Sequence, residues 1–166
     1  MSKENDEWLA SLSYVDVLTM FSGKPRLEKS MLELRKDYLK RQANKLKPVL
    51  VDEVNERCEV CGYNEKSILQ IHHILPIHKG GDNARKNLII VCPNCHKTLH
   101  SLYRTVSNKK KSYNFVDVFT KSKYTIDEQA ILLEIVMKYI KYFGDVNYEY
   151  SAKVEKYGTD NNSTGG

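Results

Sequence analysis

The chain has 166 residues, with 26 lysines and arginines against 21 aspartates and glutamates, which gives a formal net charge of +5 at pH 7. This excess, with a sequence pI of about 8.9, is too small to indicate a nucleic-acid partner by itself. The length fits one compact domain, and no apolar run is long enough to cross a membrane. The first twenty residues hold five charged side chains and no continuous apolar core. We therefore expect no secretory signal and a thiol-reducing, cytoplasmic setting.

The N-terminal part of the chain is predicted to be helical. Apolar residues from Trp8 onward indicate a short helix that Gly23 would end. A second helix is predicted from Pro25, a favourable first residue, with apolar side chains at intervals of three and four until Pro48 stops it. We assign residues 1–50 to a basic, helical N-terminal extension.

The second of these helices carries most of the local positive charge. Residues 24–47 contain nine lysines and arginines against three acidic residues. Such a surface is a candidate for binding phosphates, and the alternative is a basic face that is merely solvated. The candidate DNA contacts are Lys36, Lys40 and Arg41 here, and Lys109, Lys110 and Lys111 in a second basic segment.

All four cysteines and all five histidines lie between Cys58 and His100. The cysteines form two Cys-x-x-Cys pairs, Cys58/Cys61 and Cys92/Cys95, and two such bends can complete the tetrahedral shell of a structural zinc ion. Disulfides are the alternative, and the absence of a secretory signal disfavours them. The 30 residues between the pairs exceed the roughly 15 to 20 of a plain zinc ribbon, so this loop must contain further structure.

That loop is predicted to form a hairpin that leads into a helix. Ile68–Leu75 and Leu88–Val91 are rich in branched apolar residues, and Gly80–Asn83 can form the turn between them. After the second cysteine pair, His96 and His100 are four residues apart. In a helix this spacing places both on one face, with about 5 to 6 Å between Cβ atoms, which suits two ligands of one metal ion.

The order of these features resembles the HNH endonuclease family in its zinc-supported form. The matching residues, between about 57 and 103, are Cys58-Glu59-Val60-Cys61, Ile71-His72-His73-Ile74-Leu75-Pro76, Gly80-Gly81, Asn87-Leu88-Ile89, and Cys92-Pro93-Asn94-Cys95-His96 with His100. The resemblance implies an α+β fold, in which a ββα-metal nuclease core on a four-cysteine zinc site is flanked by N- and C-terminal helices. It assigns residues 51–110 to a nuclease module that would leave 5′-phosphate and 3′-hydroxyl ends.

The family pattern implies roles for five residues. His72, His96 and His100 would bind a catalytic divalent ion, and His73 would be the general base. Asn87 would tie the loop ahead of the helix to the hairpin and help to hold that base in its productive orientation. The alternatives to a ligand role for His100 are a phosphate contact and a position on the helix surface. Adjacent strand residues point to opposite faces, so a bulge or bend is expected at His72 and His73, or their roles shift. Among Mg, Mn, Ni, Co and Zn, an all-histidine set suits Mg least.

The C-terminal third is predicted to add a long helix. Thr125-Ile126-Asp127-Glu128 matches a capping box, and an apolar stripe follows until Gly144. Because apolar residues lie on both sides of this helix, it suits either a packed core or a contact in a homodimer. We assign residues 111–157 to this helical extension and 158–166 to a disordered tail.

The leading prediction is a metal-dependent DNA endonuclease, with restriction of invading or modified DNA as the suggested role. Two alternatives belong to other classes: a zinc-stabilised nucleic-acid-binding module without cleavage, and a zinc scaffold for protein interactions. Binding without cutting in every divalent ion would favour the binding module. The scaffold predicts no salt-dependent affinity for DNA. We expect the protein to bind DNA and not to associate with a membrane.

Overall fold

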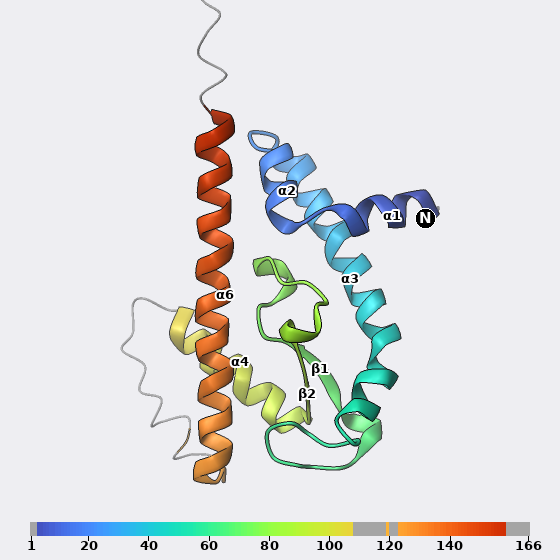
Figure 1. The fold of residues 1–166 in the computed structure, drawn as a ribbon, viewed down its shortest axis with the longest axis vertical. Coiled ribbons are helices and arrows are strands. Elements are labelled where there is room, and N and C mark those ends of the chain that lie inside the picture. Colours follow the sequence, from blue (N-terminus) through green and yellow to red (C-terminus); the bar gives the residue numbers. More distant parts are fainter. Residues whose placement is uncertain (1–2, 108–118, 120–122, 159–166) are drawn as a thin grey trace, which may run out of the picture.

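The computed structural model describes residues 3–107, 119 and 123–158 (Figure 1). The main elements are α1 (Lys3–Ser11), α2 (Tyr14–Met20), α3 (Pro25–Glu53), β1 (Gln70–His73), β2 (Leu88–Val91), α4 (Pro93–Ser107) and α6 (Ile126–Gly158). Three short 3-10 turns lie around the hairpin: η1 (Lys66–Ile68), η2 (Ile77–Lys79) and η3 (Arg85–Asn87). Helices combined with a small two-stranded sheet confirm the predicted α+β class. None of the described helices is both long and apolar enough to cross a membrane.

Two helices, rather than the single one predicted, precede Gly23. The chain breaks before α2 because Ser13 caps that helix in a capping box with Asp16. The Asp16 N–H donates to Ser13 Oγ at 3.0 Å, and the Ser13 N–H donates to Asp16 Oδ2 at 3.0 Å. These reciprocal bonds satisfy two backbone donors that an uninterrupted helix would have paired internally.

The predicted end of α3 at Pro48 is wrong, because the helix continues to Glu53. A proline inside a helix removes one backbone hydrogen bond and costs about 3 kcal/mol. Beyond it, however, Leu50 and Val51 are buried in the core, at 7% and 1% exposure. Burial of two such side chains contributes about 1.5 to 3 kcal/mol each, which is enough to offset the proline.

The hairpin pairs β1 and β2 in antiparallel register, with Gln70 opposite Val91 and His73 opposite Leu88. All four residues of β2 are buried, so this strand lies at the centre of the core. The first strand is shorter than predicted at both ends. Its end is set by Asn87, whose backbone oxygen accepts from Ile74 N–H at 2.8 Å and whose Oδ1 accepts from Leu75 N–H at 2.7 Å.

Helix α6 runs along one side of the molecule, beside α4 and the N-terminal helix α2 (Figure 1). The capping box at its start is confirmed: Glu128 N–H donates to Thr125 Oγ1 at 3.2 Å, and Thr125 N–H donates to Glu128 Oε2 at 2.7 Å. The helix continues beyond Gly144, where the apolar stripe stops, to Gly158. A helical glycine costs only about 1 kcal/mol, and contacts beyond it offset that cost.

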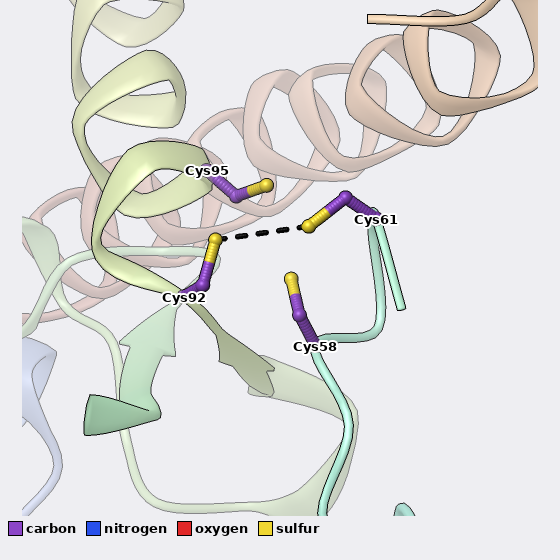
Figure 2. Close-up of side chains that lie close together, drawn as sticks. All are labelled: Cys58, Cys61, Cys92 and Cys95. Atoms are coloured by element: carbon purple, nitrogen blue, oxygen red, sulfur yellow. Dashed lines mark hydrogen bonds between the residues drawn. The ribbon is translucent and has the colours of Figure 1, made fainter. Parts of the chain in front are cut away.

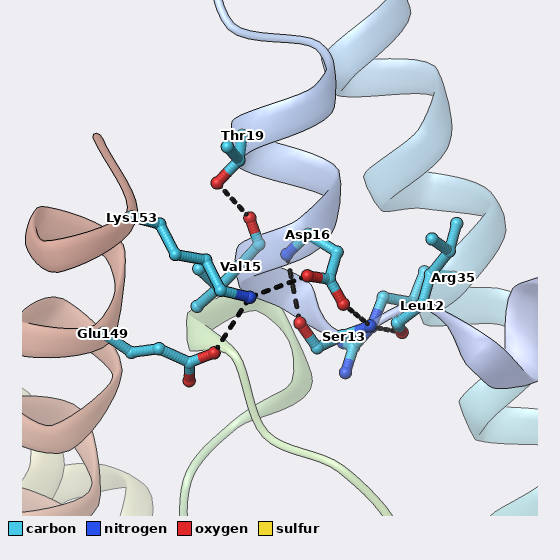
Figure 3. Close-up of polar contacts among 8 residues, drawn as sticks. All are labelled: Leu12, Ser13, Val15, Asp16, Thr19, Arg35, Glu149 and Lys153. Carbon is cyan, nitrogen blue, oxygen red and sulfur yellow. Dashed lines mark hydrogen bonds and ion pairs between the residues drawn. The ribbon is translucent and has the colours of Figure 1, made fainter. Parts of the chain in front are cut away.

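The contacts beyond Gly144 join α6 to α2 (Figure 3). Lys153 Nζ donates to Asp16 Oδ1 at 2.8 Å and lies 3.2 Å from Glu149 Oε1. Bonds from Lys153 and Ser13 lower the pKa of Asp16 to about 2, so this carboxylate stays charged near neutral pH. The ion pair therefore ties the C-terminal half of α6 to the N-terminal extension.

Candidate functional site

The four cysteines come together where the loop after α3 meets the junction of β2 and α4 (Figure 2). Their sulfur atoms all lie within 4.8 Å of one another, and Cys61 Sγ is 3.7 Å from Cys92 Sγ. All four are free thiols, so the disulfide alternative is not what the structure contains. Four sulfur donors in this arrangement fit the tetrahedral shell of zinc.

The pKa values of Cys58, Cys61 and Cys95 are shifted in different directions. A hydrogen bond from the Cys95 thiol, with backbone N–H groups, lowers the pKa of Cys58 to about 5. Burial raises the pKa of Cys61 to about 11. The hydrogen bond with Cys58 raises the pKa of Cys95 well above the ordinary value of a cysteine. A Cys58 thiolate beside the protonated thiols of Cys61 and Cys95 is the state expected without a cation. A divalent ion would favour deprotonation of every ligand, as zinc sites require.

The second cluster consists of His72 from β1 with His96 and His100 from α4. One ring nitrogen from each lies within 4.8 Å of the others. The ring centroids are 5.1 Å apart for His72 and His96, 5.2 Å for His72 and His100, and 4.6 Å for His96 and His100. The structure thus brings together the three residues that the sequence suggested as ligands of one ion.

His72 is the buried member of this cluster, with 2% of its surface exposed. Burial, together with the charges of the neighbouring histidines, lowers the pKa of His72 to about 2, so its ring is neutral at pH 7. Its Nε2 atom is buried without a hydrogen-bond partner. A neutral imidazole with an unpartnered buried nitrogen beside His96 and His100 fits a divalent metal ion. His100 is exposed, which leaves this cluster open on one side.

His73 does not share the position of His72. The register of β1 is regular through both residues, so the bulge that we expected at this pair is absent. Regular alternation directs the two side chains to opposite faces of the strand. His73 Nε2 lies 2.8 Å from Asn83 Oδ1, while Asn83 Nδ2 donates to the Leu39 carbonyl of α3 at 2.8 Å. Burial lowers the pKa of His73, and the bond with Asn83 acts in the opposite direction.

The side chain of Asn87 forms its hydrogen bonds with backbone groups and not with the side chain of His73. Besides its bond with Leu75 N–H, its Nδ2 donates to Leu75 O at 3.1 Å and to Asp82 O at 2.8 Å. Close packing also makes Gly81 necessary here, because a Cβ at that position would lie 1.8 Å from the Leu75 carbonyl oxygen. The side chain that contacts His73 is Asn83, which sequence reasoning noted only as part of a turn.

Basic residues gather near the histidine cluster from three elements. Lys36 of α3 and His78 of η2 line a groove of about 390 Å³. Burial lowers the pKa of His78, and the charges of Lys79, Lys36 and His100 lower it further, so these groups lie close together. Arg104 of α4 acts in the same way on His100. Sequence reasoning missed Lys79 and Arg104, because each reaches the site only through folding.

The structure does not locate the other candidate DNA contacts beside the histidines. Lys40 and Arg41 are exposed on α3, and Arg41 forms an ion pair with Asp6 at 3.4 Å. Lys109, Lys110 and Lys111 lie outside the described residues. Of the predicted set, Lys36 is therefore the member that the structure locates beside His78.

A hairpin and a following helix that gather three histidines beside four cysteines form the core expected of a ββα-metal nuclease. Residues 58–102 match the model of the HNH endonuclease family, which confirms the resemblance for this segment. Over 50 residues the chain is 38% identical to the type IV methyl-directed restriction enzyme EcoKMcrA of Escherichia coli (strain K12). That match covers 26% of this chain and 18% of that enzyme. No solved structure matched the chain significantly.

Proposed function

We propose that this protein is a metal-dependent DNA endonuclease that hydrolyses phosphodiester bonds to 5′-phosphate and 3′-hydroxyl ends. The observation that carries the proposal is the convergence of ring nitrogens from His72, His96 and His100 within 4.8 Å. The HNH match over residues 58–102 supports DNA as the substrate. The four cysteines would hold a structural zinc ion that maintains this frame.

His72, His96 and His100 would hold the catalytic ion. Three protein ligands with an exposed member leave room for water or substrate, as catalytic metal sites do. Nitrogen donors favour Zn, Ni, Co or Mn over Mg, which prefers oxygen. When bound, the ion would orient the phosphate and offset the charge that develops on its oxygens.

His73 is the proposed general base, and Asn83 determines which of its nitrogens is available. Asn83 uses Nδ2 to donate to Leu39 O, so its Oδ1 faces His73 Nε2. A carboxamide oxygen only accepts, so Nε2 carries the proton of the neutral ring and Nδ1 holds the lone pair. Nδ1 would therefore take the proton from water.

If His73 is the general base, the scissile phosphate must lie where both His72 and His73 can face it. His72 and His73 lie on opposite faces of β1, and within the described residues β1 pairs with β2 alone. One edge of β1 is therefore unpaired there. A phosphodiester lying along that edge would face both the ion held by His72 and the ring of His73. We place the scissile phosphate at this edge.

Lys36, His78, Lys79 and Arg104 are the proposed phosphate contacts around the site. They come from α3, η2 and α4, and electrostatic coupling to His78 or His100 supports their proximity. Lys40, Arg41 and the lysines at 109, 110 and 111 stay candidates for more distant contacts. Backbone phosphate contacts of this kind supply salt-dependent affinity without sequence preference.

We further propose that the enzyme serves in restriction. The similarity to a methyl-directed restriction enzyme, although it covers 18% of that protein, favours invading or modified DNA as the target. A single site of this kind cuts one strand, so double-strand cleavage would require a homodimer. The exposed apolar residues Met137 and Ile140 on α6, at 64% and 42% exposure, are the proposed contact.

A plasmid-nicking assay tests the nuclease proposal. Purified protein is incubated with supercoiled DNA in Mg, Mn, Ni, Co or Zn, alongside the variants His73→Ala and His78→Ala. Metal-dependent nicking should fall at least about 10²-fold in His73→Ala. The His78→Ala control should weaken salt-sensitive binding but keep the rate at saturating DNA. Binding without cutting in every ion would support the binding module instead.

A further inference from the structure

Two buried tyrosines stack against each other beside the histidine cluster. Tyr103 of α4 and Tyr139 of α6 have ring centroids 4.2 Å apart and planes inclined by 14°. Their exposed fractions are 5% and 3%. The Tyr139 hydroxyl accepts from Lys79 Nζ at 2.5 Å and lies 2.9 Å from Ser107 Oγ. The Tyr103 hydroxyl is buried without any hydrogen-bond partner.

This difference matters because a buried hydroxyl without a partner is expected to lower the stability of the fold. A buried hydroxyl that has lost its water and gained no partner carries an uncompensated desolvation cost. Phenylalanine would keep the stacking on Tyr139 and fill the same space without that cost. The hydroxyl therefore has no structural purpose among the described residues, unlike its neighbour on Tyr139.

The position of Tyr103 indicates where its partner belongs. His96, His100 and Tyr103 are spaced at four and three residues along α4, which places them on one helix face. The Tyr103 ring lies 5.3 Å from the His72 ring and 6.5 Å from the His100 ring, between centroids. Among the described residues, two buried side-chain atoms lack partners: the Tyr103 hydroxyl and His72 Nε2. Both side chains lie at the cluster, since His72 is one of its members and the Tyr103 ring is next to the His72 ring.

We propose that the Tyr103 hydroxyl donates a hydrogen bond to an oxygen ligand, water or phosphate, held at the three-histidine cluster. A phenol O–H is a strong donor to an oxygen that bears negative charge, and no proton need be transferred. In the reaction, the same bond would stabilise charge that grows on the phosphate. The phosphate part rests on the proposed nuclease function, whereas the water part requires only that the cluster binds a metal ion.

The test compares Tyr103→Phe with Tyr139→Phe in the full chain, with zinc retained by the cysteines. The two changes remove one oxygen each from stacked, equally buried rings. Without added metal, Tyr103→Phe should unfold at the wild-type temperature or above, whereas Tyr139→Phe should unfold at a lower one. In calorimetric titration, Tyr103→Phe should bind Ni²⁺ about 10-fold more weakly, as for other groups that support metal ligands. Tyr139→Phe should stay within about twofold of the wild type.

Cleavage assays complete the test. In the working metal, Tyr103→Phe should lower kcat with little change in KM, and Tyr139→Phe should not. Ni²⁺ affinity that depends on the Tyr103 hydroxyl, in a protein that cuts no DNA, would support this inference while the nuclease proposal failed. Wild-type Ni²⁺ affinity and kcat in Tyr103→Phe would overturn the inference while the nuclease proposal stood. A wild-type protein that binds no Ni²⁺ would also overturn it.

Discussion

The two candidate metal sites differ in how completely the protein encloses them. The cysteine cluster has four ligands, of which Cys58, Cys92 and Cys95 are buried, with at most 4% exposure. The histidine cluster has three ligands that range from buried His72 to exposed His100. One helix serves both, because α4 contributes Cys95 to the first and the adjacent His96 to the second. A closed site suits folding, whereas an open one suits chemistry.

The largest expected effect comes from breaking the closed site. Cys95→Ser should abolish zinc binding and cooperative folding of the hairpin module. A structural zinc contributes about 10 to 16 kcal/mol in small domains, which matches or exceeds the whole stability of a typical fold. Zinc analysis and thermal unfolding would measure both effects. A variant that folds cooperatively without zinc would show that the cysteines are not structural ligands.

The neighbouring substitution His96→Ala should have the opposite profile. It should retain zinc, fold and DNA binding, but lose metal-dependent cleavage by about 10³-fold or more. The catalytic ion contributes several kcal/mol to the transition state, and each 1.36 kcal/mol is tenfold in rate. Cys95→Ser and His96→Ala change adjacent positions, so each controls for disturbance of α4 by the other. Loss of zinc in His96→Ala would contradict the separation of the two sites.

Metal uptake should depend on pH in only one of the two sites. Burial and hydrogen bonding raise the pKa of Cys61 and of Cys95, so zinc must displace a proton from each near pH 7. Because at least these two protons are displaced, apparent zinc affinity should rise at least about 10²-fold per pH unit. The pKa values of His72, His96 and His100 are all lowered by burial, so these rings are already neutral. Their affinity for Ni²⁺ should change less than about twofold between pH 7 and 8.

Proton release can be counted by titration calorimetry in buffers of different ionisation enthalpy. Zinc should release at least two protons at pH 7, those of Cys61 and Cys95, and Ni²⁺ should release almost none. Equal proton release at the two sites would contradict the electrostatic difference between them.

The parts of these sites that could be predicted from sequence depend on local spacing. Two Cys-x-x-Cys bends and the four-residue step from His96 to His100 fix ligand geometry within one turn each, whatever the rest of the fold does. Tyr103 and Asn83 could not be found that way. Their significance depends on Tyr139 and on the Leu39 carbonyl, which lie 36 and 44 residues away in the chain and approach only after folding.

Two local stop signals fail to end their helices for a related reason. Pro48 and Gly144 are local stop signals, worth about 1 to 3 kcal/mol. Tertiary contacts made further along each helix exceed that cost: burial of Val51 in one case, and the bond from Lys153 to Asp16 in the other. A local signal predicts the end of a helix only when nothing beyond it is buried or paired.

The smallest expected effect concerns Asn83, whose partner His73 points to the opposite face of β1 from the metal ligand candidate His72. Asn83→Ala should reduce kcat about 10-fold while zinc content, Ni²⁺ affinity and KM stay near wild type. The reason is that Asn83 orients a base and binds neither ion nor substrate. In a His73→Ala background the same change should have no further effect, because a positioning residue acts only through the group that it positions. Additive losses in the double variant would show that Asn83 acts independently of His73, and would remove the basis for assigning Nδ1 as the proton acceptor.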